Sequence, residues 1–137
     1  MRPKDATGGV ALTVRPFGED DRAAWASFVH DCPDATFFHR IEWRDIIEQV
    51  FGHRTHYLIA RRGVAIAGVL PLAQVKSLLF GHSLVSLPFA VYGGAAVTDE
   101  EARLLLHAAA AELARKLQVD YLELRNRSSY EPGWPQQ

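Results

Sequence analysis

The segment THYLIARRGVAIAGVLPLAQV, residues 55–75, decides the fold class of this chain. Residues 55–60 form a short apolar, β-rich run, and ArgArgGly at 61–63 supplies a tight turn. A second apolar run at 64–75 follows the turn, so the two runs predict a β-hairpin. Pro71 lies inside the second run and has no N–H to give to a strand ladder. We therefore expect this strand to bend at Pro71.

Three elements are expected before this hairpin. Residues 10–16 are β-rich and close with a proline, which predicts a first strand. The acidic segment 18–21 begins a helix that stops at Pro33, and Asp34 or Thr36 is expected to cap a second helix that stops at Gly52. The two apolar stripes at helical spacing are Trp25, Phe28, Val29 and Cys32, and then Trp43, Ile46, Ile47 and Val50.

The chain after the hairpin predicts two further strands around one long helix. Residues 84–88 read as a strand and TyrGlyGlyAla at 92–95 as a turn. Thr98 or Asp99 is expected to cap the long helix, whose acidic first turn and basic last turn suit the helix dipole. Residues 119–124 alternate as a closing strand. The stripe of the long helix that faces the core is Leu106, Ala110, Leu113 and Leu117.

The predicted order is β-α-α-β-β-β-α-β, an α/β chain with a mixed α+β sheet. A right-handed crossover would place the last strand parallel to the strand that precedes the long helix. This order resembles the GNAT-like acyl-CoA N-acyltransferase fold. We expect a flexible tail at 1–9, a single domain at 10–127 and a frayed tail at 128–137.

The composition of the chain excludes several classes of function. A chain of 137 residues makes one ordinary domain, and a net charge of −1 argues against a general nucleic-acid surface. The single cysteine, Cys32, excludes an internal disulfide and a thiolate-rich zinc site, and its place on an apolar stripe favours core packing over nucleophilic chemistry. No secretory signal and no transmembrane segment are recognisable, so we expect a soluble, cytoplasmic protein.

Few residues point to catalysis or metal binding. His53 and His56 are three apart, which places them on opposite faces of a strand, and no metal site is expected. No Gly-Xaa-Ser-Xaa-Gly elbow is present, which argues against a serine hydrolase. The aromatic group at 37–40, with Trp43 and Phe51, is expected mainly to pack a helix on the sheet. The candidate general bases are Glu42, Asp45, Glu48 and Glu123, and their spacing singles out none.

Two features favour binding of an anion. Glycines between a strand and a helix, here Gly93 and Gly94, let backbone N–H groups approach an anion, although they can equally serve a turn that needs positive φ. Lys76, Arg125 and Arg127 follow predicted strands and could contact a phosphate or carboxylate, with plain solvation as the alternative.

Four blocks of sequence carry a resemblance to a known family. They are TFFHRIEWR at 36–44, FGHRTHYLIA at 51–60, GVLPLAQVKSLLFG at 68–81 and SLPFAVYGG at 86–94. Together they resemble the first half of the FemAB-like proteins, in particular the branch associated with exosortase and exopolysaccharide loci in bacteria. The resemblance implies a GNAT-type fold and a transferase that moves an aminoacyl or acyl group onto an amine.

This resemblance also implies the reactants. Aminoacyl-tRNA or acyl-CoA would be the donor substrate, with no bound cofactor, and the acceptor would be a small molecule or a cell-envelope precursor. FemAB-like enzymes have two GNAT-like halves and this sequence resembles one, over about 14–127. The usual GNAT pyrophosphate loop is not found at 91–95, where ValTyrGlyGlyAla stands. We expect one lobe of a two-lobed transferase, with tRNA as a partner only if the whole enzyme uses aminoacyl-tRNA.

Two other functions remain open from the sequence. One is a non-catalytic interaction module or truncated remnant that forms a homodimer or pairs with another chain. The other is a self-sufficient acetyl-CoA-dependent N-acetyltransferase. For the leading prediction, the substrate-binding residues are His39, Trp43, Lys76, Tyr92, Gly93, Gly94, Arg125 and Arg127, of which His39 and Trp43 are expected to line the cleft.

Overall fold

The structure, a computed structural model, describes residues 11–77, 81–86 and 94–124. Its elements in chain order are β1 (Leu12–Pro16), the 3-10 turn η1 (Glu19–Asp21), α1 (Arg22–Asp31), the 3-10 turn η2 (Phe37–His39), α2 (Glu42–Gln49), β2 (Arg54–Thr55), β3 (Leu58–Arg62), β4 (Ala65–Leu70), β5 (Leu72–Ser77), β6 (Gly81–Ser86), β7 (Ala96–Val97), α3 (Glu100–Leu117) and β8 (Tyr121–Glu123). The predicted tails, 1–9 and 128–137, lie outside the described residues, and the domain bounds stay a prediction.

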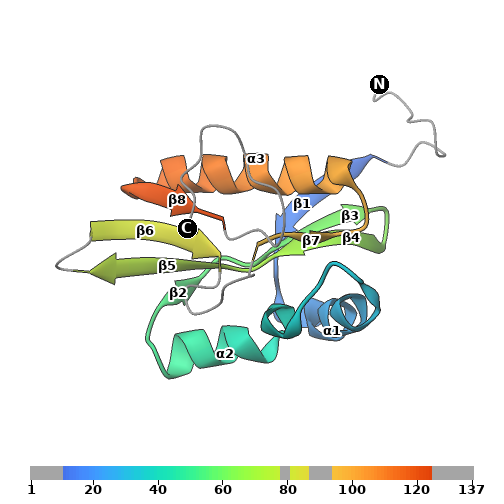
Figure 1. Ribbon diagram of the computed structural model, residues 1–137, viewed down its shortest axis with the longest axis horizontal. Coiled ribbons are helices and arrows are strands. Elements are labelled where there is room, and N and C mark those ends of the chain that lie inside the picture. The colour runs from blue at the N-terminus through green and yellow to red at the C-terminus, as the bar shows by residue number, and fades with distance from the viewer. Residues whose placement is uncertain (1–10, 78–80, 87–93, 125–137) are drawn as a thin grey trace.

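The strands form two four-stranded sheets between layers of helices. One sheet has the order β1-β3-β4-β7 and the other β2-β5-β6-β8. In Figure 1, α3 lies on one side of the sheets, and α1 and α2 lie on the other. Each side has its own core: Leu70, Leu72 and Leu106 belong to the α3 side, and Trp25 and Ile47 to the α1–α2 side. The predicted mixed α/β arrangement is therefore confirmed.

The two sheets share one bent ribbon. β3 pairs with β4 through Leu58 and Leu70, and β2 pairs with β5 through Thr55 and Ala73, in the same antiparallel register. Pro71, which is fully buried, lies between β4 and β5. Because His56 N bonds Leu72 O, the nitrogen of Pro71 faces the outer side of the ribbon, where it has no N–H for a further strand. The ribbon bends there, and the strand on that side changes from β7 beside β4 to β6 beside β5. The predicted bend is confirmed.

This bend also divides the preceding strand. Residues 55–60 were expected to form one strand, but β2 ends at Thr55 and β3 begins at Leu58, in different sheets. Tyr57 lies in the break: its carbonyl accepts from the N–H of Phe17 at 2.8 Å, and its ring stacks on Trp25 with centroids 5.0 Å apart. Burial raises the pKa of the Tyr57 hydroxyl. The prediction of a single strand at 55–60 is wrong because this segment pairs with both β4 and β5. Where those two strands bend apart at Pro71, their partner must divide as well.

The closing strand is placed as predicted. β8 pairs parallel with β6, through Ser83 with Tyr121 and Val85 with Glu123. The chain crosses over through α3 between these two parallel strands, as the prediction required. The strand predicted at 84–88 is β6, which ends at Ser86; residues 87 and 88 lie outside the described residues.

The start of the second helix differs from the prediction. Thr36 caps the turn η2, where its hydroxyl accepts from Phe38 N at 3.1 Å, and α2 begins only at Glu42. Asp34 caps neither element. Its carboxylate accepts from Val97 N at 3.1 Å and pairs with Arg103 at 3.0 Å, so long-range partners outcompete the local cap.

Asp99 caps α3 as predicted. Its Oδ1 accepts from Ala102 N at 2.9 Å, and its Oδ2 lies 2.7 Å from Arg62 Nη1. The helix ends at Gln118, which has a left-handed φ of 56°. The core-facing positions Leu106 and Ala110 are fully buried against the sheets. The cap and the ion pair therefore fix the start of α3 to β3.

We predict that Gly68→Ala destabilises the fold. An added Cβ would lie 2.7 Å from Val97 Cγ1 and 3.0 Å from Leu106 Cδ1, so strand and helix would have to move apart. We expect a loss of about 1–3 kcal/mol in the free energy of unfolding, measured by urea denaturation. Gly18→Ala is the control, because the nearest atom to its Cβ is Asp21 Oδ2 at 3.7 Å. Equal effects of the two variants would contradict the prediction.

We predict that the Asp99 carboxylate makes stability depend on pH. The Arg62 guanidinium, together with the Ala102 N–H, holds the pKa of Asp99 below its usual value. The stabilisation is therefore complete above the unfolded pKa, about 3.9, and is lost as pH falls through the lower folded pKa. Asp99→Asn should be less stable than wild type at pH 7, with the difference shrinking below about pH 4. Urea denaturation from pH 2.5 to 7 measures this, with Asp20→Asn as control; a pH-independent difference would argue against it.

Candidate functional site

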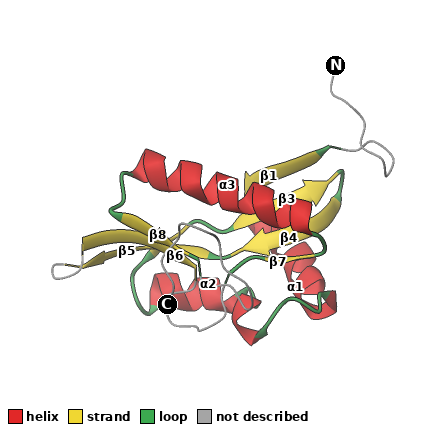
Figure 2. Ribbon diagram, turned by 45° about the horizontal axis from the view of Figure 1, so that its top comes forward, coloured by secondary structure: helices red, strands yellow, loops and turns green. Residues whose placement is uncertain are grey.

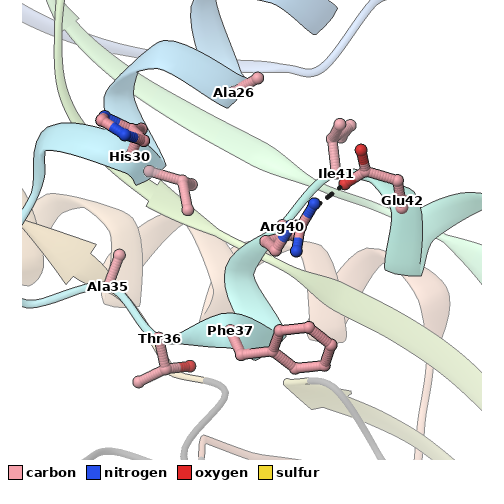
Figure 3. Close-up of a pocket in the computed structure, with 9 residues that line it drawn as sticks. Ala26, His30, Ala35, Thr36, Phe37, Arg40, Ile41 and Glu42 are labelled. Atoms are coloured by element: carbon pink, nitrogen blue, oxygen red, sulfur yellow. Dashed lines mark ion pairs between the residues drawn. The ribbon is translucent and has the colours of Figure 1, made fainter.

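A pocket lies between α1 and the segment that leads into α2 (Figure 3). Its volume is about 510 Å³, within the range of small-molecule sites. The lining residues are Ala26, Val29, His30, Ala35, Thr36, Phe37, Arg40, Ile41 and Glu42. We call it the α1–α2 pocket.

Local sequence builds the wall of this pocket. α1 ends at Asp31, just before Pro33, and the chain turns back through the bond from Ala35 N to Cys32 O at 3.0 Å. Trp25 on α1 is fully buried, and its Nε1 donates to His39 O at 2.7 Å. That bond holds α1 and η2 at a fixed separation. The two sides of the pocket, α1 and η2, are therefore connected by a buried hydrogen bond.

The α1–α2 pocket has an apolar floor and a charged rim. Ile41 is buried and Val29 half-buried, whereas Arg40 and Glu42 are exposed at the rim. Arg40 Nε lies 3.7 Å from Glu42 Oε1, the ion pair marked in Figure 3. The Arg40 guanidinium lies 5.6 Å from the centroid of the Phe37 ring. A small ligand with an apolar body and a charged end would match this lining.

His39 connects the pocket wall to the chain before β7. Its ring is buried, and Nδ1 accepts from Thr36 N at 3.0 Å. The proton therefore sits on Nε2, which donates to Gly94 O at 2.6 Å. His39 thus bonds three parts of the chain at once: Thr36, Gly94 and, through its backbone, Trp25.

The structure brings some of the predicted binding residues together. His39 and Gly94 are in direct contact. Trp43 packs beside the pocket, with its ring centroid 5.9 Å from that of Phe37. Lys76 lies away from this group, on β5, where it lines a different hollow. The predicted residues Tyr92, Gly93, Arg125 and Arg127 lie outside the described residues.

The four candidate general bases have different surroundings. Glu42 lies at the rim of the α1–α2 pocket. Asp45 binds the Arg22 guanidinium with both oxygens, at 3.0 and 3.1 Å. The carboxylate of Glu48 accepts from the Thr55 hydroxyl, and Glu123 is buried on β8. Glu42 is thus the one of the four that faces the pocket.

Sequence reasoning missed most of the pocket lining. Phe37 and Phe51 were expected to pack in the core, but their exposed fractions are 59% and 46%. Phe38 and Trp43 do pack against the α1–α2 core. Arg40 and Glu42, close to Phe37 in sequence, were the signal that could have predicted its exposure, because charged neighbours favour an exposed segment.

Comparison with known proteins supports the fold. No protein-family model matches the chain, and no curated protein matches it in sequence. A solved GNAT family acetyltransferase from Staphylococcus aureus subsp. aureus USA300_TCH1516 superposes with a TM-score of 0.58 at 13% identity, over 93% of this chain and 98% of that one. A solved transcriptional regulator from Bacillus halodurans C-125 superposes with a TM-score of 0.58 at 13% identity, over 89% of this chain and 83% of that one.

This chain therefore has a GNAT-like fold, as its element order predicted. Among the described residues, no helix has both the length and the apolar character needed to cross a membrane. Within the same residues, no three His, Cys, Asp or Glu side chains gather as a metal site would require.

We predict that His39→Ala loosens the pocket wall. The substitution leaves the buried Gly94 carbonyl without the donor that His39 supplies, and an unmet buried polar group costs about 1–3 kcal/mol. His30→Ala is the matched control, because its ring is exposed and bonds the neighbouring, also exposed, Asp31. Thermal and urea unfolding should show the loss for His39→Ala alone. Similar stability of the two variants would refute a structural role for His39.

Proposed function

We propose that this domain transfers an acyl group to an amine acceptor that binds in the α1–α2 pocket. The observation that carries the proposal is the charged rim of Arg40 and Glu42 over an apolar floor, on a GNAT-like fold. Glu42 would bind the ammonium group of the acceptor, and Arg40 an anionic group on the same molecule. The Phe37 ring would cover the apolar part.

The reaction would join the acceptor nitrogen to the carbonyl carbon of the donor. The bound ammonium group first gives one proton to a base, and the neutral amine then attacks; the C–S bond of a thioester or the C–O bond of an ester breaks as the tetrahedral intermediate collapses. A second proton, lost by the nitrogen after the attack, ends on the departing thiol or hydroxyl. Glu42 is placed to receive the first proton, because its carboxylate faces the pocket.

The finer assignment rests on sequence resemblance. We infer that the domain is a FemAB-related aminoacyl or acyl transferase, one lobe of a two-lobed enzyme of bacterial cell-envelope or exopolysaccharide synthesis. The resemblance block 36–44 supports this assignment, because it includes Thr36, Phe37, Arg40, Ile41 and Glu42 of the pocket lining. A self-sufficient acetyl-CoA-dependent N-acetyltransferase is the narrower alternative that the same fold supports.

A non-catalytic interaction module is the second candidate. Val50 and Phe51, at the end of α2, are 70% and 46% exposed, which is unusual for neighbouring apolar side chains. In this function the domain would form a homodimer or pair with another chain through that surface. Sedimentation of wild type and of the double variant Val50→Ser/Phe51→Ser tests this second function. Self-association of wild type that is lost in the variant supports the interaction module. A wild type that stays monomeric at all concentrations argues against a homodimer.

We predict that Glu42→Gln weakens acceptor binding. A panel of primary amines would be incubated with acetyl-CoA or aminoacyl-tRNA, and the acylated product identified by mass spectrometry. Loss of a charge-assisted bond of about 1.5–3 kcal/mol should raise KM for the amine roughly 10- to 100-fold, and loss of the proton acceptor should also lower kcat, whereas KM for the donor should stay unchanged. Arg40→Gln should act similarly on acceptors that carry an anionic group.

The matched control is Glu112→Gln, which removes the acidic member of an exposed ion pair with Arg115 on α3, away from the pocket. It should leave both KM values unchanged. Absence of any acylated product with every donor and amine would overturn the proposed transfer. Product formation with Glu42→Gln indistinguishable from wild type would instead place the acceptor outside the α1–α2 pocket.

A further inference from the structure

A second hollow lies on the sheet β2-β5-β6-β8, away from the α1–α2 pocket. Its volume is about 400 Å³, and the residues that line it are Phe51, Gly52, His53, Arg54, Gln74 and Lys76. None of these residues lines the α1–α2 pocket. We call it the β2–β5 hollow.

The strand register places the polar side chains of the β2–β5 hollow on one face of the sheet. Arg54 pairs with Gln74 across β2 and β5, and Lys76 pairs with His82 across β5 and β6. Cross-strand partners share a face, and residues two apart on β5 share it too. Leu72 precedes Gln74 on the same face and packs in the core under α3. In Figures 1 and 2 the β5 and β6 strands extend past the end of α3, so no helix of the described residues lies over this end of the face.

Arg54 and Lys76 differ from most cations of the described chain. The arginines in ion pairs within 4.0 Å of a carboxylate are Arg22, Arg40, Arg44, Arg61, Arg62, Arg103 and Arg115. Within the described residues, neither Arg54 nor Lys76 has such a partner, although both line one hollow. Two like charges that line one hollow repel each other, and an anion between them would lower that repulsion.

Gln74 is held in place between two histidines. Its Oε1 lies 2.9 Å from His56 Nε2, and its Nε2 lies 2.7 Å from His82 Nε2. With the amide in this orientation, His56 donates from Nε2 to the Gln74 carbonyl, and His82 accepts at Nε2 from the Gln74 amide nitrogen. An acidic side chain also lies beside β6: Asp120 Oδ2 accepts from the backbone N–H of His82 at 2.8 Å. The hollow therefore has two permanent positive charges beside a fixed polar side chain.

We propose that the β2–β5 hollow binds a small phosphate-bearing molecule through Arg54 and Lys76. A guanidinium matches two phosphate oxygens at once, and an ammonium adds a point charge. The volume of the hollow suits a molecule of nucleotide size, with Phe51, 46% exposed, as a flat surface for a ring. This inference does not depend on acyl transfer at the α1–α2 pocket.

The test uses the full chain, with pyrophosphate and AMP as phosphate-bearing probes and adenosine as the phosphate-free control. Binding is followed by backbone amide NMR shifts and by calorimetry at 50 and 300 mM NaCl. We expect shifts centred on Arg54–His56 and Lys76, at least about tenfold weaker binding for Arg54→Gln/Lys76→Gln, and weaker binding at the higher salt. Stronger binding of AMP than of pyrophosphate would support a ring contact at Phe51.

The matched control is Arg15→Gln/Lys116→Gln, which removes the same charge from two cations without a carboxylate partner within the described chain. Its affinity should equal that of wild type. Equal weakening by both double variants, or unchanged affinity in Arg54→Gln/Lys76→Gln, would overturn the proposal. Without a ligand, Arg54→Gln/Lys76→Gln should unfold at the same or a higher temperature than wild type, so lost binding cannot be attributed to misfolding. Glu42→Gln should bind both probes normally, which separates this proposal from the acceptor pocket.

Discussion

The missing N–H of Pro71 is the constraint on which the rest of the structure depends. Residues on both sides of it continue one antiparallel register, from Leu58 with Leu70 to Thr55 with Ala73. An uninterrupted ribbon would build one long sheet, but the nitrogen of Pro71 faces the outer side of the ribbon and has no N–H for a further strand, so the ribbon bends there. β1 and β7 then join the β3–β4 half, and β6 and β8 join the β2–β5 half. The bend thereby sets the partners of every other strand.

The division of the ribbon into the β3–β4 and β2–β5 halves explains the structural role of His39. β6 and β7 follow one another along the chain but pair with different halves of the ribbon, and Gly94 lies just before β7. The bond from His39 Nε2 to Gly94 O fixes that approach to β7 against η2. Arg103 adds a second tie, because it bonds both Ala95 O and Asp34. The wall of the α1–α2 pocket is consequently positioned by the far side of the sheet as well as by its own helices.

Sequence patterns predicted what depends on neighbours along the chain. Pro71 marked the bend, Asp99 the cap of α3, and the apolar runs the strands, because each acts through residues a few positions away. Long-range partners produced the errors. Asp34 binds Val97 N and Arg103 rather than capping a helix, and Phe37 is exposed because η2 turns it away from the core. No local pattern encodes the contact of His39 with Gly94, although both residues were predicted to bind substrate.

The cations of the described residues differ in whether they pair with a carboxylate on another element. Arg22 joins α1 to α2 through Asp45, Arg61 joins β3 to η1 through Asp21, and Arg103 joins α3 to Asp34. Each pair connects different elements and leaves the guanidinium less than half exposed, so each is explained by the fold alone. Arg54 and Lys76 connect no elements in this way. Arg15 and Lys116 also lack a carboxylate partner among the described residues, so the feature that favours the proposed phosphate site is the position of Arg54 and Lys76 in one hollow.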